Sequence, residues 1–239
     1  MQGTRSVIVN GMNVRLHESS KQGPLVVFVH GLISDHRTWR PQLDHLGGSY
    51  HCVAYDMRYH GLSAKPPSLQ PYSLAQHASD LAELIHALGS GPVHVVAHGY
   101  GACVAIAAAL ENQSRVRSLT LVEPSLETML YEAQDAPVRA AAEMQFEQIH
   151  AELKRRRPFA AMEAFAWWVD NGQMASWRAI PQEYQAMVVD NAHTIGLWAH
   201  APETLKLGSA EIRALSMPVL VLNGQETQAY FGRIGERLS

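Results

Sequence analysis

Val95-Val96-Ala97-His98-Gly99-Tyr100-Gly101-Ala102 is the stretch of sequence that decides the fold of this chain. The run that leads into it, residues 92–97, is rich in valine and favours a strand. The segment at its end, residues 102–110, consists of small and aliphatic residues without proline or glycine and favours a helix. The sequence therefore predicts a strand that turns sharply into a helix.

This strand–turn–helix setting is typical of the G-x-S-x-G motif, in which a nucleophilic serine sits on a strained turn. In that frame Gly99 occupies the serine position and Ala97 occupies the first glycine position. Glycine adopts a positive φ at little cost, so Gly99 relieves the strain that a serine would carry there. The pattern predicts the turn and leaves the nucleophile position without a hydroxyl group.

Strands and helices alternate on both sides of this turn. Asn10-Gly11 separates two short alternating runs and predicts an antiparallel hairpin. The later strands are continuous apolar runs, which is typical of strands buried on both faces. We therefore expect a mostly parallel sheet with helices on both faces, entered from an antiparallel edge. The expected strands are residues 6–9, 12–17, 24–30, 51–55, 92–97, 118–122 and 217–222, and the expected helices are 37–46, 73–88, 102–110 and one from about residue 230.

The alternation stops at Glu123-Pro124. From residue 124 to residue 216 the pattern is helical, without obvious strands, and rich in methionine and tryptophan. Such side chains are suited to burying one face of an inserted segment on the main domain. We therefore expect a first core part over residues 1–123, a helical lid over 124–216, and a second core part over 217–239.

Composition limits the classes of protein that this chain can belong to. Its 239 residues suit one α/β domain with an insertion, and 47% hydrophobic with 17% charged residues permits a large core. A net charge of −3 gives no reason to expect a nucleic-acid partner. With no apolar stretch of membrane-spanning length and no signal-like N-terminus, we expect a cytoplasmic protein without a membrane partner. Cys52 and Cys103 are expected to be reduced core thiols.

Five motifs in order resemble the α/β-hydrolase family, and the resemblance covers nearly the whole chain. They are His30-Gly31-Leu32 as the HG loop, residues 56–63 as the D-x-R-G-x-G-x-S loop with Tyr59 in place of a glycine, the turn at 97–101, the strand end at 121–124, and the penultimate strand at 218–224. The resemblance implies an α/β-hydrolase fold with an inserted lid. The family's last strand, its catalytic histidine loop and its final helix would follow Ser239, so the resemblance implies that they are missing from this sequence.

The resemblance also assigns the parts of a site. The oxyanion donors would be the backbone N–H groups of Leu32 and Tyr100, which do not depend on side-chain identity. Glu123 is the favoured acid, because the carboxyl end of a parallel strand faces the ligand crevice. Glu226 is a weaker candidate, one residue from the family's other acidic position at Thr227. No base histidine is assigned. The expected pocket residues are His30, Gly31, His98, Trp167, Trp168 and Trp177.

Three functions fit these observations. The first is a lineage that hydrolyses esters or related bonds of small apolar molecules, with the nucleophile lost as Gly99. The second is a non-catalytic protein that binds a small molecule, and the third is a cofactor-independent oxygenase or lyase on the same fold. No cofactor is expected, and no metal, because no pair of histidines has the spacing of a known ligand motif. The sequence predicts no oligomeric state.

Overall fold

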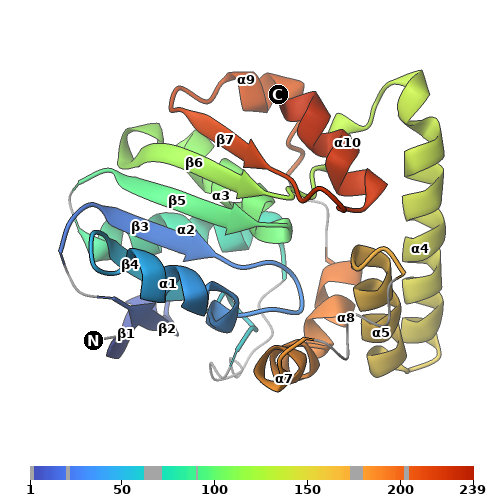
Figure 1. The fold of residues 1–239 in the computed structure, drawn as a ribbon, viewed down its shortest axis with the longest axis horizontal. Helices are drawn as coiled ribbons and strands as arrows, with labels where there is room; N and C mark the ends of the chain where they lie inside the picture. Colours follow the sequence, from blue (N-terminus) through green and yellow to red (C-terminus); the bar gives the residue numbers. More distant parts are fainter. Residues whose placement is uncertain (1–2, 20–21, 62–71, 90, 173–179, 202–204) are drawn as a thin grey trace.

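The computed structural model describes residues 3–19, 22–61, 72–89, 91–172, 180–201 and 205–239. The described residues form a seven-stranded sheet with the order β1-β2-β4-β3-β5-β6-β7 (Figure 1). This sheet, with helices on both of its faces, confirms the predicted α/β fold. The strands are β1 (Gly3–Val9), β2 (Met12–Glu18), β3 (Leu25–Val29), β4 (His51–Tyr55), β5 (Val93–His98), β6 (Val116–Val122) and β7 (Val219–Leu222).

The antiparallel edge of the sheet is the predicted hairpin. β1 and β2 pair with Val9 opposite Met12, and the turn residues Asn10 and Gly11 both have positive φ, 45° and 74°. Two positive φ values are what a tight two-residue hairpin turn needs. β2 then pairs antiparallel with β4, and the remaining pairs are parallel. β7 lies at the far edge of the described sheet.

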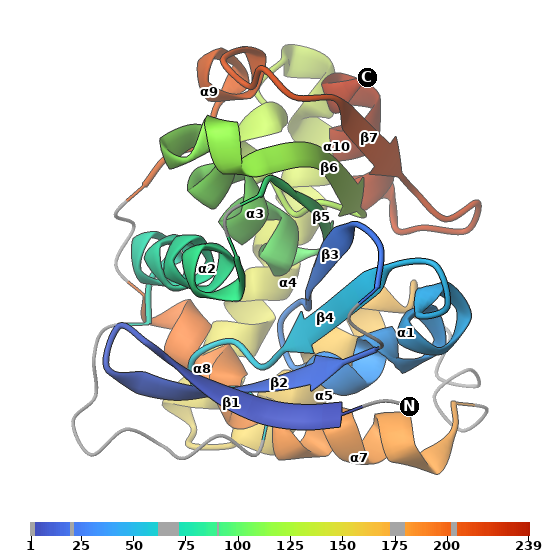
Figure 2. The same cartoon turned by 90° about the vertical axis from the view of Figure 1, so that its left-hand side faces the viewer.

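Alternate residues of the central strands face opposite layers of the core. In β3, Val27 and Val29 pack with α2 and α3, whereas Val26 and Phe28 pack on the side of Trp39 and Leu43. This two-sided burial explains why the strand reads as an unbroken apolar run. Figure 2 shows α2 and α3 on one face of the sheet and α1 on the other. These helices are α1 (Arg40–Leu46), α2 (Leu74–Leu88) and α3 (Tyr100–Glu111).

The structure changes one helix boundary. The segment predicted as a single helix over 37–46 begins with a 3₁₀ turn, His36–Trp39, before α1 starts at Arg40. Pro41 lies in the first turn of α1, where a residue without an N–H is tolerated, but it could not continue a helix that began earlier. The proline therefore sets the start of the α-helix.

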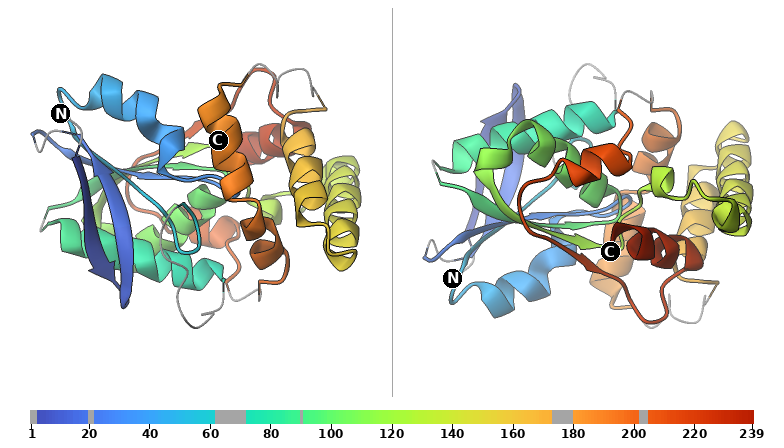
Figure 3. Two further views of the ribbon diagram at one scale, coloured as in Figure 1. Left: turned by 90° about the horizontal axis from the view of Figure 1, so that it is seen from below. Right: turned by 90° about the horizontal axis from the view of Figure 1, so that it is seen from above.

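The described parts of residues 124–216 hold helices and no strand, as predicted. Most of this segment lies beyond the carboxyl ends of the parallel strands (Figures 1 and 3). Ile149, Met162 and Ile195, from three of its helices, pack together with Ile33 of the loop after β3. The segment is thus anchored at the edge of the sheet where α/β proteins bind ligands. Its helices are α4 (Ala136–Lys154), α5 (Pro158–Val169), α7 (Gln182–Asp190), α8 (His193–Ala199) and α9 (Ser209–Arg213), and α10 (Ala229–Leu238) follows β7.

The turn between β5 and α3 has the predicted geometry. Gly99 lies between the two elements with φ 56° and ψ −121°, outside the regions that most residues favour. Gly101 has a different role. A Cβ at Gly101 would lie 2.2 Å from the carbonyl oxygen of His30 and 2.9 Å from that of Val29. Only a residue without a side chain lets the start of α3 pack this closely on the end of β3.

We expect Gly101→Ala to lower the free energy of unfolding by about 3 kcal/mol, because its methyl group overlaps backbone atoms that cannot move independently. Urea unfolding followed by circular dichroism measures the change. Gly48→Ala is the matched control, since a Cβ at Gly48 meets no atom within 4 Å, and its effect is expected to stay within about 0.5 kcal/mol. Equal stabilities of the two variants would contradict the close approach.

Candidate active site

A cavity of about 1410 Å³ lies where the loops after the strands meet the helical segment of residues 124–216. Its wall is built by the β5–α3 turn, the loop after β3, the residues after β6 and the helical segment, with Leu74 of α2 and Tyr230 and Phe231 of α10. Most of the lining is aliphatic or aromatic. Concave, mostly apolar spaces at this edge of a parallel sheet are the usual ligand sites of α/β proteins.

Gly99 faces this cavity beside the loop that follows β3. A Cβ built at Gly99 would have only the Cα of Gly31, 4.0 Å away, within contact range. The loop itself comes close because residue 31 is glycine: a Cβ there would lie 3.1 Å from Nδ1 of His98. Position 99 is therefore open, and a larger side chain would point into free space rather than into packed atoms.

Leu32 and Tyr100, the two positions expected to donate to an oxyanion, both line the cavity. Tyr100 is the first residue of α3, so its N–H has no acceptor within the helix. The Leu32 N–H donates to no acceptor in the described part of the chain. Both residues thus line the same cavity as Gly99 with backbone N–H groups that have no acceptor in the described chain, and such groups can donate to a carbonyl oxygen that gains negative charge.

The two acid candidates occupy different environments. Glu123 follows β6, has φ 45°, and lines the cavity. Its Oε1 accepts a hydrogen bond from the N–H of Gly224, 3.2 Å away, which ties the end of β6 to the loop after β7. Glu226 is exposed on that loop and is not part of the cavity wall. The position of Glu123 is the one from which a carboxylate can act on a bound molecule.

The structure corrects the placement of His30, which was expected in the pocket. His30 is completely buried, and its Nδ1 donates to the carbonyl of Gly31, 2.8 Å away. Its Nε2 accepts from the backbone N–H of Met57 at 3.0 Å. Burial also lowers the pKa of this imidazole, so the neutral ring is favoured. His30 thus links the loop after β3 to the loop after β4 by hydrogen bonds, and it is not part of the cavity wall.

Two histidines, His98 and His150, belong to the described part of the cavity wall. Nδ1 of His98 is buried against the loop at Gly31, and burial lowers the pKa of the ring. Nδ1 of His150 donates to the carbonyl of Phe146, 2.7 Å away. Neither ring is hydrogen-bonded to a hydroxyl or thiol of the described lining, so the paired nucleophile and base of a serine hydrolase is not formed by these residues.

Aromatic side chains form one side of the cavity. Trp168 is 6% exposed and packs its ring against Phe146 and Tyr230, with centroids 5.2 Å and 5.3 Å away. Trp167 also lines the cavity but is 45% exposed, at the outer part of the wall. Trp177, the third expected tryptophan, lies outside the described residues. The described aromatic wall is thus closely packed near Trp168 and open to solvent near Trp167.

The charged groups of the described wall are mainly negative. Arg139 is its only arginine or lysine, and Nη1 of Arg139 already donates to the carbonyl of Glu132, 2.9 Å away. This balance favours a neutral ligand over an anion. The carboxylates on the wall are Glu123, Glu127, Glu163 and Asp170.

Two residues beside Gly99 were not expected in the site. The N–H of Ser125 donates to the carbonyl of Gly99 at 3.3 Å, and the thiol of Cys103 donates to the carbonyl of Ser125 at 3.5 Å. Both residues line the cavity. The signal for Cys103 was its position four residues after Gly99, one turn along the same helix face. Burial raises the pKa of Cys103 to about 11, so its thiol stays protonated and weakly nucleophilic at neutral pH.

The family follows from a comparison with known proteins. A family model described as the alpha/beta hydrolase fold matches residues 24–229. The chain belongs to the α/β-hydrolase family. The matched range runs from the start of β3 to the start of α10, so it contains Gly99, Leu32, Tyr100 and Glu123, while Tyr230 of the aromatic wall lies just beyond it.

Curated relatives of this α/β-hydrolase chain match it over shorter stretches. The 2-(acetamidomethylene)succinate hydrolase of Mesorhizobium japonicum is 33% identical over 150 residues, which cover 62% of this chain and 52% of that protein. Epoxide hydrolase 1 of Caenorhabditis elegans is 36% identical over 108 residues, 44% of this chain and 27% of that protein. The matches therefore span about half of the first relative and about a quarter of the second.

Solved structures resemble this α/β-hydrolase chain over nearly its whole length. An alpha/beta hydrolase from Sphaerobacter thermophilus superposes with a TM-score of 0.75 at 23% identity, over 98% of this chain and 87% of that one. The enol-lactonase from Burkholderia xenovorans gives a TM-score of 0.72 at 18% identity, over 98% and 87% of the two chains. At these identities the likeness establishes the fold and leaves the reaction open.

A buried histidine packs against Tyr100, the residue that follows Gly99 in this α/β hydrolase. His77 of α2 packs against the rings of Tyr72 and Tyr100, with centroids 4.5 Å and 5.7 Å away. Both of its ring nitrogens are buried without a hydrogen-bond partner in the described chain. Burial lowers the pKa of His77 to about 3. The ring therefore supports Tyr100 by packing, and it does so only in its neutral form.

Acid should weaken the fold through this residue. An unfolded histidine takes up a proton below a pKa of about 6.5, whereas folded His77 takes it up near pKa 3, so stability is full above pH 6.5 and declines as the pH falls toward 3. Between pH 7 and pH 5, protonation of His77 in the unfolded chain should by itself lower the free energy of unfolding by about 2 kcal/mol. Urea unfolding of the wild type and of His77→Phe at pH 7 and pH 5 measures this loss, which the variant should lack.

His86→Gln is the matched control, because His86 lies on the same helix and is exposed. It should keep the wild-type loss between pH 7 and pH 5. A His77→Phe variant that loses as much stability as the control over this range would show that His77 is not responsible.

Proposed function

We propose that this chain derives from a lineage of α/β hydrolases that cleave esters or related bonds of small apolar molecules, and that Gly99 has removed the covalent step. The observation that carries the proposal is the open position 99, at φ 56° in the same cavity wall as Leu32 and Tyr100; apart from its chain neighbours, the described residues place only the Gly31 Cα within 4.0 Å of its missing Cβ. A serine Oγ there would point at a carbonyl held by the two donors. Every other part of the turn is compatible with that chemistry.

The lining of the cavity supports a neutral apolar ligand. Its helical segment acts as a lid, with Trp168 and Phe146 as a packed wall against which a hydrocarbon or aromatic group can lie. The carboxylates of Glu127, Glu163 and Asp170 disfavour anions, and Arg139 is engaged with backbone carbonyls. By its name the Mesorhizobium japonicum relative hydrolyses a substituted succinate. The present wall lacks the free cations that would recognise two carboxylates, as far as its described residues go.

Hydrolysis at this site would need two further groups. The first is a hydroxyl at position 99, and the second is a base that takes its proton. The chain's own residues supply the two backbone donors and the carboxylate of Glu123, which can orient a base. As it stands the site can hold a carbonyl compound and polarise it, while no acyl intermediate can form at Gly99.

A second candidate function is a binding protein that needs no turnover. It is favoured by the absence of a histidine paired with a hydroxyl or thiol in the described wall, since recognition by Leu32, Tyr100 and the apolar lining requires neither. The two candidates differ in what a restored hydroxyl does.

Gly99→Ser, assayed with added imidazole as the missing base, should produce a burst of p-nitrophenol from p-nitrophenyl acetate or butyrate, because the added hydroxyl enters open space beside both donors. Stopped-flow absorbance measures the burst and the turnover that follows. The matched control is Gly99→Ala, which adds the Cβ without the hydroxyl and should show no burst. If Gly99→Ser is folded by circular dichroism yet reacts no faster than Gly99→Ala, the hydrolase lineage loses its main support and the binding protein is preferred.

The wild-type protein should bind neutral esters and lactones and reject their charged counterparts. We expect dimethyl succinate at concentrations well above its Kd to raise Tm by several degrees, since binding to the folded state alone stabilises it. Succinate, of similar carbon skeleton but doubly negative, should leave Tm unchanged. Differential scanning fluorimetry measures both, and a larger shift with succinate would contradict the neutral-ligand assignment.

A further inference from the structure

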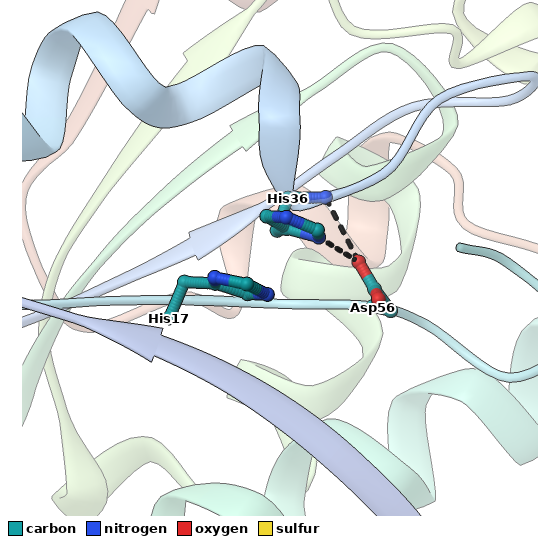
Figure 4. Close-up of side chains that lie close together, drawn as sticks. All are labelled: His17, His36 and Asp56. Atoms are coloured by element: carbon teal, nitrogen blue, oxygen red, sulfur yellow. Dashed lines mark hydrogen bonds and ion pairs between the residues drawn. The ribbon is translucent and has the colours of Figure 1, made fainter. Parts of the chain in front are cut away.

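Three side chains that no part of the site uses converge on the outer side of the sheet. His17 comes from β2, His36 opens the 3₁₀ turn after β3, and Asp56 directly follows β4. One ligand-capable atom from each lies within 4.8 Å of the other two. Figure 4 shows the two imidazole rings lying face to face, with the carboxylate at their edge. None of the three lines the large cavity.

The rings are held in a fixed arrangement. The centroids of His17 and His36 are 3.4 Å apart and their planes differ by 4°. Oδ1 of Asp56 accepts the backbone N–H of His36 at 3.0 Å and lies 2.6 Å from Nδ1 of the same residue. The chain thus brings two imidazoles and one carboxylate together without needing a ligand to do so.

Two atoms of this cluster are left without partners. Nε2 of His17 and Oδ2 of Asp56 are buried and make no hydrogen bond in the described part of the chain. A buried polar atom without a partner destabilises the folded state, so such atoms are uncommon unless something else binds them. Two of them in one cluster, both of types that ligate metals, indicate a missing ligand.

The charge of the cluster points to a cation. Nearby buried carboxylates have arginine partners: Asp35 pairs with Arg37 at 2.7 Å and Asp80 with Arg58 at 2.8 Å. No arginine or lysine pairs with Asp56 in the described residues, and its side chain is 0% exposed. Its only ion-pair partner among the described residues is the imidazole of His36, which is charged only when protonated, and a buried carboxylate without a permanent positive partner is costly. His36, at 16% side-chain exposure, leaves a route from solvent to the cluster.

We propose that His17, His36 and Asp56 form a binding site for a divalent transition metal, with Zn²⁺ as the best fit. Two imidazoles and one carboxylate are borderline nitrogen and oxygen ligands that suit Zn²⁺ and Co²⁺, whereas Mg²⁺ and Ca²⁺ prefer oxygen ligands alone. The metal takes the place of the proton between Nδ1 of His36 and Oδ1 of Asp56 and also binds Nε2 of His17. A water molecule completes a tetrahedral shell.

Binding requires a small rearrangement. Tetrahedral bonds of about 2.0–2.1 Å place two ligand atoms about 3.4 Å apart. The three ligand atoms now lie within 4.8 Å of one another, and Nδ1 of His36 and Oδ1 of Asp56, at 2.6 Å, must move apart to admit the metal. The stacked rings must also splay, because the lone pair of an imidazole lies in the ring plane. His36 is the partly exposed member and is the one that can turn.

The site would connect three segments of the fold. His36 lies four residues after Leu32, in the same loop that carries the oxyanion position, and Asp56 begins the loop after β4. A metal bound here fastens that loop to the sheet from outside the cavity. Its role is structural, and it does not depend on the function proposed above.

The test uses the untagged full chain, stripped with a chelator and titrated with ZnCl₂ and CoCl₂. Isothermal calorimetry should give one equivalent of Zn²⁺, and Zn²⁺ should raise Tm while excess EDTA reverses the rise. His17→Gln should weaken Zn²⁺ binding at least about tenfold. His86→Gln, an exposed histidine elsewhere, should bind as the wild type does.

Zn²⁺ binding that is absent, unaffected by His17→Gln, or matched by Mg²⁺ would overturn the proposal. If His17→Gln does not fold, the visible spectrum of the wild type with Co²⁺ decides. An intense tetrahedral band that Asp56→Asn or His36→Gln removes supports the site, and the weak spectrum of octahedral Co²⁺ overturns it.

Discussion

The structure depends on one close contact between backbones, where the start of α3 lies against the end of β3. A Cβ at Gly101 would approach the His30 carbonyl to 2.2 Å, so this contact exists only because residue 101 is glycine. It places Gly99 at the carboxyl edge of the sheet and brings the loop at Gly31 and Leu32 alongside it. The open position and both backbone donors follow from this packing rather than from any side chain.

The same packing separates binding from chemistry. Backbone N–H groups belong to the turn itself, so loss of a serine side chain leaves them in place. Nucleophilic attack, in contrast, depends on one hydroxyl and one base, and neither is formed by the described residues around Gly99. The α/β-hydrolase fold can therefore present an apolar cavity beside backbone N–H groups at a position that carries no nucleophilic side chain.

Histidines in this chain serve the fold in several ways. His30 joins Gly31 to Met57 through both ring nitrogens, and His60 donates from Nδ1 to the carbonyl of Ser34, 2.8 Å away. His77 packs without any hydrogen bond in the described chain. Burial lowers the pKa of all three rings, so the imidazoles that pack against the loops around the cavity are neutral.

Sequence alone determined the order of strands and helices, the sharp turn at Gly99, the hairpin at Asn10-Gly11 and the family motifs, because these depend on local propensity and spacing. It also named Glu123, Leu32 and Tyr100, which motif position places at the carboxyl edge of the sheet. The sequence placed His30 in the pocket, whereas the structure buries it outside the cavity wall. A motif does not tell which face of a loop a ring occupies.

Only the tertiary structure decided the rest. It buried His30 beneath the loop, put Cys103 and Ser125 beside Gly99, and set Trp168 rather than Trp167 in the packed part of the wall. It also brought His17, His36 and Asp56 together from three separate elements. Such contacts are set by strand order and loop packing. They join residues that are far apart in the chain, so they leave no spacing pattern in the sequence.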